Sequence, residues 1–316
     1  MTAQGVWVNG GGEGPPGMFL VDGLLVVVGA VVSLLPEAVA EPFQYAFMQR
    51  ALLAAVVVGA VCGVLSCFVI LKRWALLGDA ISHAVLPGVA VAYLLGWPFF
   101  IGAFLTGALT SVGIGLLERR TRLKADAAMG LMFTAAFALG VVIISQIATS
   151  THLLHVLFGN VLGVGAEALL LILAAGAVAV GAVLFFYKEL FAYTFDEVQA
   201  QSLGFNTTVI HYGLILLLTL TIVASLETVG IILVVAMLIT PGATAYMITD
   251  HLPRMILLAA FFGAASGVLG LYLAFHYNVA SGGTMVLVAT AFFLLALVFS
   301  PRHGLLGRWF PRGATH

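Results

Sequence analysis

The sequence is poor in charged residues. Only 8% of its 316 residues are Asp, Glu, Lys or Arg, whereas 62% are hydrophobic. A soluble domain carries about 25% charged residues to keep its surface wet, so this composition excludes an ordinary soluble protein. Long apolar runs separated by short charged segments are instead typical of helices that cross a membrane.

Cysteine and soluble-type catalytic motifs are equally scarce. The two cysteines, Cys62 and Cys67, are five residues apart and lie on different faces of a helix, which disfavours both a disulfide and a shared metal site. We interpret them as packing residues. The sequence contains neither a GxxxxGK[ST] run, the signature of a P-loop that binds ATP, nor the HExxH signature of a metalloprotease. A net charge of −1 gives no indication of a nucleic-acid partner.

The hydrophobic runs predict an all-α, polytopic transmembrane bundle. At about 20 residues per span, the chain divides into about nine spans, within limits of about eight to ten. The candidate spans are 51–71, 79–97, 98–118, 126–148, 166–187, 208–226, 228–249, 254–276 and 282–300. Small-xxx-small spacing at Gly59 and Gly63, and again at Gly263 and Gly267, favours close packing between helices in lipid.

Positive charges follow alternate spans. All but one of the Lys and Arg residues come after the first, third, fifth, seventh or ninth span, and Arg50 is the exception. Because Lys and Arg are retained on the cytoplasmic side, this pattern predicts a cytoplasmic C-terminus.

The ends of the chain differ from its centre. Residues 1–17 are rich in Gly and Pro and are predicted to be disordered. Residues 18–40 contain a candidate extra membrane helix, with a signal-like segment or an upstream leader as alternatives. We assign 41–306 to a membrane domain and 307–316 to a cytoplasmic tail.

The run LLGDAISHAVLPG (76–88) contains the sharpest candidate site. Asp79 and His83 are four residues apart, so on a helix they point the same way and can together hold a divalent cation such as Mn²⁺, Zn²⁺ or Fe²⁺. If the chain is helical from Arg73, His83 lies about 15 Å further in, near the middle of the membrane. Pro87 and Gly88 would bend this helix. In the alternative interpretation, Asp79 caps the helix and His83 bonds to a neighbouring helix.

Other ionisable residues are weaker candidates. Glu227 and His155 lie on the outer side and are candidates for a metal pathway. Four further histidines near span ends are expected to be solvated: His211, His251, His276 and His303.

The cytoplasmic stretch FAYTFDEVQAQSLGFN (191–206) is too polar to span the membrane. Its residues Asp196, Glu197, Ala200 and Gly204 predict a short helix that ends at a glycine. Such a helix suits docking onto a partner protein, although an ordinary interfacial connection would look the same.

Five runs, in this order, resemble the permease subunit of ATP-binding-cassette (ABC) importers for manganese, zinc or iron. The runs are LKRWALLGDAISHAVLPGVAVAYLLG (71–96), HVLFGNVLGV (155–164), FDEVQAQSLG (195–204), SLETVGIILVVAMLITPGATAY (225–246) and SGGTMVLVATAFFLL (281–295). The resemblance covers residues 41–306.

The resemblance implies a type II-like importer permease that works by alternating access in the cytoplasmic (inner) membrane of a prokaryote. It implies a homodimer, ABC ATPase subunits that hydrolyse the ATP, and an extracytoplasmic metal-binding protein. Asp79 and His83 match the family's metal-binding pair, and Asp196, Glu197, Ala200 and Gly204 match its ATPase-coupling helix. Glu227 departs from the glutamine expected at its position.

The resemblance therefore predicts a transport subunit without enzymatic activity or a permanent cofactor, whose cargo is a divalent transition metal. The FGNVLGV run, with Asn160, resembles the manganese and iron members more than the zinc ones, and we expect Mn²⁺, with Zn²⁺ or Fe²⁺ as alternatives. A rival hypothesis is an ATP-independent secondary transporter or channel for divalent cations, which would need a relay of several buried acids. A permease for a siderophore or cobalamin would not need the acid–imidazole pair.

Overall fold

The computed structural model describes residues 18–33, 40–146 and 161–300, and every regular element in these ranges is a helix. Nine of the described helical segments are long and apolar enough to cross a membrane, and they coincide with the nine predicted spans. The predictions for residues 1–17 and 307–316 lie outside the described part of the chain.

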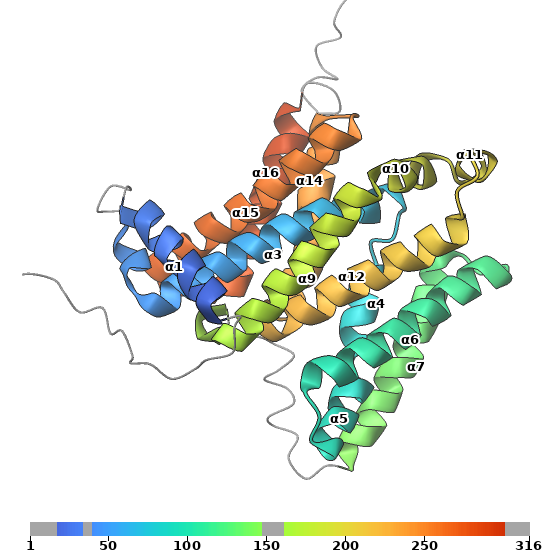
Figure 1. The fold of residues 1–316 in the computed structure, drawn as a ribbon, viewed down its shortest axis with the longest axis horizontal. Coiled ribbons are helices and arrows are strands. Elements are labelled where there is room, and N and C mark those ends of the chain that lie inside the picture. The colour runs from blue at the N-terminus through green and yellow to red at the C-terminus, as the bar shows by residue number, and fades with distance from the viewer. Residues whose placement is uncertain (1–17, 34–39, 147–160, 301–316) are drawn as a thin grey trace, which may run out of the picture.

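Seven spans are single helices and two are broken (Figure 1). The single helices are α3 (Ala46–Leu71), α6 (Phe99–Arg120), α7 (Ala125–Ser145), α9 (Ala166–Phe185), α12 (Thr207–Val229), α15 (Leu252–Tyr277) and α16 (Ser281–Phe299). The broken spans are α4 (Leu77–Ala84) with α5 (Leu86–Leu95), and α13 (Ile231–Met237) with α14 (Thr240–Ile248). Short helices outside the spans are η1 (Glu41–Gln44), η2 (Val161–Gly163), α10 (Tyr187–Phe195) and α11 (Glu197–Ser202).

Proline accounts for both breaks. Pro87 lies in the first turn of α5 and Pro241 in the first turn of α14. Proline has no N–H to donate to the preceding turn, so it is tolerated at a helix start but interrupts a continuous helix. The expected bend near Pro87 is therefore a break, at Val85.

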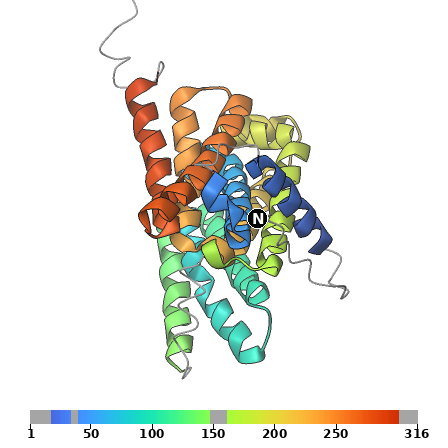
Figure 2. The same ribbon diagram turned by 90° about the vertical axis from the view of Figure 1, so that its left-hand side faces the viewer.

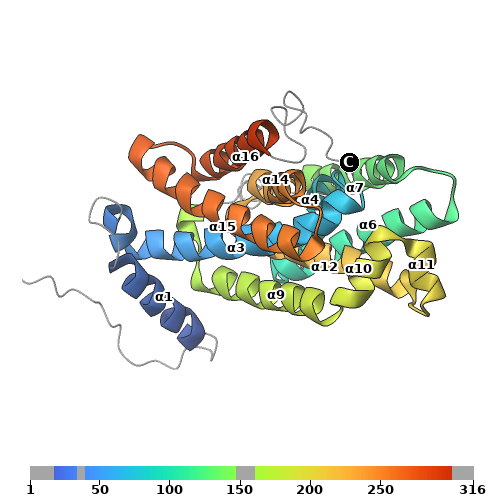
Figure 3. The ribbon, with the colours of Figure 1, turned by 90° about the horizontal axis from the view of Figure 1, so that it is seen from above.

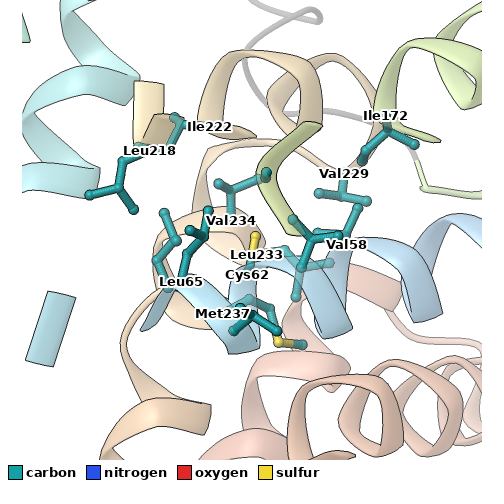
Figure 4. Close-up of a cluster of buried hydrophobic side chains, with 14 of the residues drawn as sticks. Val58, Cys62, Leu65, Ile172, Leu218, Ile222, Val229, Leu233, Val234 and Met237 are labelled. Atoms are coloured by element: carbon teal, nitrogen blue, oxygen red, sulfur yellow. The ribbon is translucent and has the colours of Figure 1, made fainter. Parts of the chain in front are cut away.

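Helix α3 is the centre of the bundle. It is the most buried of the nine described spans, with 78% of its apolar window inside the protein. Seen from above, it has α15 along one side and α9 along the other (Figure 3). Val58, Cys62 and Leu65 pack there against α9, α12 and α13 (Figure 4). Cys62 and Cys67 are free, buried packing residues, as predicted.

Glycines bring α3 and α15 into backbone contact. A Cβ atom on Gly59 would overlap the carbonyl group of Gly263, and one on Gly267 would lie 2.8 Å from the carbonyl oxygen of Ala55. Nothing larger than glycine fits there without moving a helix, which confirms the close packing predicted from the small-xxx-small spacing.

Helices α5, α6 and α7 pack together at one side of the molecule (Figures 1 and 2). A second, smaller hydrophobic cluster, which includes Val85 and Leu86, joins α5 and α6 to α12. The broken span α4–α5 therefore runs from the central bundle into this side group.

Helix α1 (Met18–Ser33) packs against α3 and α9 outside the nine spans. Its 16 residues extend about 24 Å, less than a hydrocarbon core of about 30 Å requires. The extra membrane helix within 18–40 stays a prediction.

Candidate functional site

Asp79 and His83 form a pair on one face of α4. Asp79 lies in the first turn and His83 in the last, and the Asp79 Oδ1 and His83 Nε2 atoms are 3.4 Å apart. The Asp79 side chain is 49% exposed and that of His83 30% exposed, so both can reach a ligand from outside the chain.

The contacts of the pair disfavour the alternative of a simple cap. Leu76, not Asp79, precedes the first residue of α4, and no side chain caps that end. The His83 ring packs against two aromatic rings of α7, with centroid distances of 5.4 Å to Phe133 and 5.7 Å to Phe137. The two phenylalanines hold the imidazole in place beside the carboxylate.

The helix that carries the pair begins later than expected. Arg73 has a left-handed backbone (φ 59°), and the Trp74 N–H donates to the Val69 carbonyl at 2.9 Å, so α3 ends there in a Schellman turn. Helix α4 starts at Leu77, and His83 lies about 9 Å along it. The assumption of a continuous helix from Arg73 was wrong, so the distance of about 15 Å from Arg73 to His83 along that helix no longer applies.

The pair is next to the break in its span. His83 is two residues before Val85, where α4 gives way to α5. A Cβ atom on Gly140 of α7 would lie 2.8 Å from Leu86 Cβ and 3.0 Å from Pro87, so this glycine lets α7 press against the break. The metal-binding candidates therefore lie where the span can change direction.

Within the described residues, no three His, Cys, Asp or Glu side chains gather closely enough to hold a metal ion. Glu227 lies exposed in the last turn of α12, and its electrostatic neighbour is Glu167 at the start of α9. It does not join Asp79 and His83 in one group. His155 lies outside the described residues.

The predicted cytoplasmic helix is present as α11. Asp196 caps its start, accepting hydrogen bonds from the backbone N–H groups of Val198 (2.9 Å) and Gln199 (3.0 Å). Gly204 ends it with φ 87°, and the Phe205 N–H donates to the Ala200 carbonyl at 3.1 Å in a second Schellman turn. Only a residue that tolerates positive φ fits this end, which explains the glycine.

Helix α11 has an attached face and a free face. Ala200 is fully buried, and Glu197 forms an ion pair of 2.6 Å with Arg119 of α6. Val198 and Leu203 are 76% and 62% exposed. The helix is thus fastened to the bundle on one side and offers apolar side chains on the other.

A buried polar cluster beside α11 was not foreseen from the sequence. The Tyr193 hydroxyl lies 2.7 Å from His211 Nδ1, and the Lys72 ammonium lies 3.6 Å from the Tyr193 ring centroid. Burial raises the pKa of Tyr193, with Glu197 adding to the effect, and burial lowers that of Lys72. His211 was expected to be solvated and is only 2% exposed, because Trp74 and Tyr193 cover it.

Comparison with known proteins decides the family. The model of the family described as "ABC 3 transport family" matches residues 44–300. The chain belongs to this family. It is a transport component rather than an enzyme, and the ATPase of such a transporter is a separate partner subunit. Family membership also decides against the rival hypothesis of an ATP-independent transporter.

Several relatives cover most of the chain. It is 52% identical over 267 residues to the manganese transport system membrane protein MntC of Halalkalibacterium halodurans, covering 84% of this chain and 91% of the relative. It is 44% identical over 269 residues to the chelated iron transport system membrane protein YfeD of Yersinia pestis, covering 85% and 91%. Among solved structures, PsaBC from Streptococcus pneumoniae in complex with Fab has 41% identity and a TM-score of 0.77, covering 86% and 99%.

Proposed function

We propose that this chain is the membrane permease of an ATP-driven importer for Mn²⁺ and that Asp79 and His83 are its intramembrane metal ligands. The proposal rests on one observation: a carboxylate and an imidazole lie 3.4 Å apart, partly exposed, at the break of a membrane span. An ionisable pair within a span is costly and is a functional candidate for that reason.

The spacing of the pair suits a divalent ion. An ion about 2.1 Å from both Asp79 Oδ1 and His83 Nε2 would bind them at an angle of about 108°. An octahedral angle of about 90° would need the two atoms to approach by only about 0.4 Å. The site is therefore nearly formed before the ion arrives.

Two ligands are fewer than a divalent transition metal takes. Both side chains are partly exposed, and no third His, Cys, Asp or Glu in the described residues joins them, so a second chain is a natural source of further ligands. A second copy of the permease would supply another Asp79 and His83. We therefore propose a homodimer with the metal held between the copies.

The relatives favour Mn²⁺ as cargo. The 52% identical relative is named a manganese transport protein and the 44% identical one a chelated iron transport protein. The pair itself does not choose between metals, since an N/O site binds Zn²⁺ more tightly than Mn²⁺. Selectivity must then depend on the metal-binding protein that delivers the ion and on coordination geometry.

Helix α11 would couple ATP hydrolysis on the partner to movement of the permease. Its exposed Val198 and Leu203 would dock onto a cytoplasmic ABC ATPase, and its ion pair with Arg119 would pass movement into the bundle. ATP binding and hydrolysis would switch the pair from outward to inward access. Glu227 and His155 would line the entry path on the outer side.

The test is Mn²⁺ binding and uptake by the complete importer in vesicles, with Asp79→Ala and His83→Ala. We expect uptake to fall at least tenfold in both variants, because each removes one of the few ligands. Asp126→Ala, which removes an exposed carboxylate from the first turn of α7, is the control and should transport normally. Undiminished uptake and metal affinity in both site variants would show that the metal binds elsewhere.

A further inference from the structure

The ends of α3, α6, α10 and α12 beside α11 meet in a buried polar cluster. Trp74, Tyr193 and His211 are each no more than 2% exposed. The Tyr193 hydroxyl lies 2.7 Å from His211 Nδ1, and the Trp74 and His211 rings meet edge to face with centroids 5.3 Å apart. Buried polar groups depend on such partners, so the three side chains fix one another's positions.

The cluster is tied to α11 through Arg119. Its guanidinium binds Glu197, the first residue of α11, at 2.6 Å and donates to Thr208 of α12 at 2.8 Å. Tyr193 itself lies only three residues before Asp196, the residue that caps the start of α11. A shift of α11 therefore changes the surroundings of Tyr193 directly.

The cluster is tied to α4 through Trp74. Its N–H is fixed by the Schellman turn at the end of α3, and its carbonyl accepts a hydrogen bond of 2.9 Å from the N–H of Leu77, the first residue of α4. Asp79 is two residues further along the same rigid helix. Movement of Trp74 must therefore move the start of the helix that carries the metal pair.

We propose that Trp74, Tyr193 and His211 form a joint that transmits movement of α11 to α4 and so to Asp79 and His83. The inference rests on the proposed function, in which α11 docks onto the ATPase. The three are positioning residues, and they act through the helices that they connect. A buried hydrogen bond suits this task because it is electrostatically stronger in the low-dielectric interior of the protein than in water.

The joint also has capacity to rearrange. His211 Nε2 and Glu118 Oε2 are buried without a hydrogen-bond partner in the described residues. These atoms can form new hydrogen bonds when the helices shift, which would give the joint a second arrangement for the other access state.

The experiment measures Mn²⁺ imported and ATP hydrolysed in the same vesicles, using the permease assembled with its ATPase and binding protein. Tyr193→Phe keeps the ring beneath Lys72 and removes the hydroxyl that meets His211. We expect Mn²⁺ import per ATP to fall about threefold to tenfold while hydrolysis continues. Tyr187→Phe, which removes a hydroxyl near the start of the same helix, is the control and should leave the ratio unchanged.

Trp74→Phe tests the other end of the joint and decides the matter if Tyr193→Phe cannot be recovered from membranes. An unchanged ratio in the recovered variants, with the ATPase bound and Mn²⁺ affinity intact, would overturn the joint alone. Failure of the unaltered permease to retain the ATPase, or normal transport by Asp79→Ala, would instead contradict the proposed function.

Discussion

Single residues govern how closely the two longest helices approach. At Gly59 the backbone of α15 occupies the space that a side chain would need. We predict that Gly59→Ala destabilises the purified protein by about 1–3 kcal/mol, because the added methyl group forces the helices apart. Thermal unfolding in detergent measures the effect.

Gly181→Ala is the matched control. Gly181 lies within α9, and a Cβ atom there would meet nothing within 4 Å. Alanine should leave stability unchanged or raise it slightly, since it favours the helix more than glycine does. Equal unfolding temperatures for the two variants would contradict the backbone contact between α3 and α15.

For single residues, the sequence predicted the placement of side chains correctly where their spacing along a helix alone decides it. Asp79 and His83 are four positions apart, and a helix places such residues on one face whatever surrounds it. His211 could not be assigned in the same way. Its burial depends on Trp74 and Tyr193, which reach it from other parts of the chain, and no local pattern encodes that meeting.

Among the elements, α11 depends on its caps because it has only six residues. Asp196→Ala removes the acceptor for two backbone N–H groups and should cost about 1 kcal/mol of local stability. We predict about fivefold faster hydrogen exchange in 197–202. Weaker co-purification of the ATPase should accompany it.

Asp196→Asn separates capping from charge, because asparagine caps a helix about as well as aspartate. It should preserve both slow exchange and ATPase binding. If Asn behaves like Ala, the carboxylate acts by its charge and not as the cap of α11.

The sequence predicted the position of the membrane spans but not the turn between α3 and α4. Hydropathy located all nine spans, because the length of an apolar run is a local property. It did not locate the turn from Arg73 to Leu76, since Arg73 is a non-glycine residue in a left-handed conformation that tertiary contacts of Trp74 hold in place. The estimated depth of His83 assumed a continuous helix from Arg73 and lost its basis for that reason.

For the whole molecule, the property to test is its orientation in the membrane. The ends that carry Lys72 and Arg119 lie together beside α11, as the distribution of positive charge requires if this side is cytoplasmic. We predict that a membrane-impermeant thiol reagent labels Gly282→Cys in intact cells. It should label Arg122→Cys only after the membrane is opened.

The native thiols favour this measurement, because Cys62 and Cys67 are buried and should react slowly. The unsubstituted chain is the control for background labelling. Labelling of Arg122→Cys in intact cells would show that the topology is the opposite of the predicted one, with the C-terminus outside.

Gly59 and Gly63 of α3 and Gly263 and Gly267 of α15 form a glycine seam, where the backbones of the two helices are in contact. This seam limits how the sequence can vary. No amino acid is smaller than glycine, so every replacement at Gly59 or Gly263 adds atoms where the other backbone already lies. At Asp79, by contrast, glutamate or asparagine still offers an oxygen to a cation. In a library of random single substitutions, the seam glycines should therefore accept fewer amino-acid types than Asp79 and His83. Helix packing would then restrict sequence change more strongly than metal binding does.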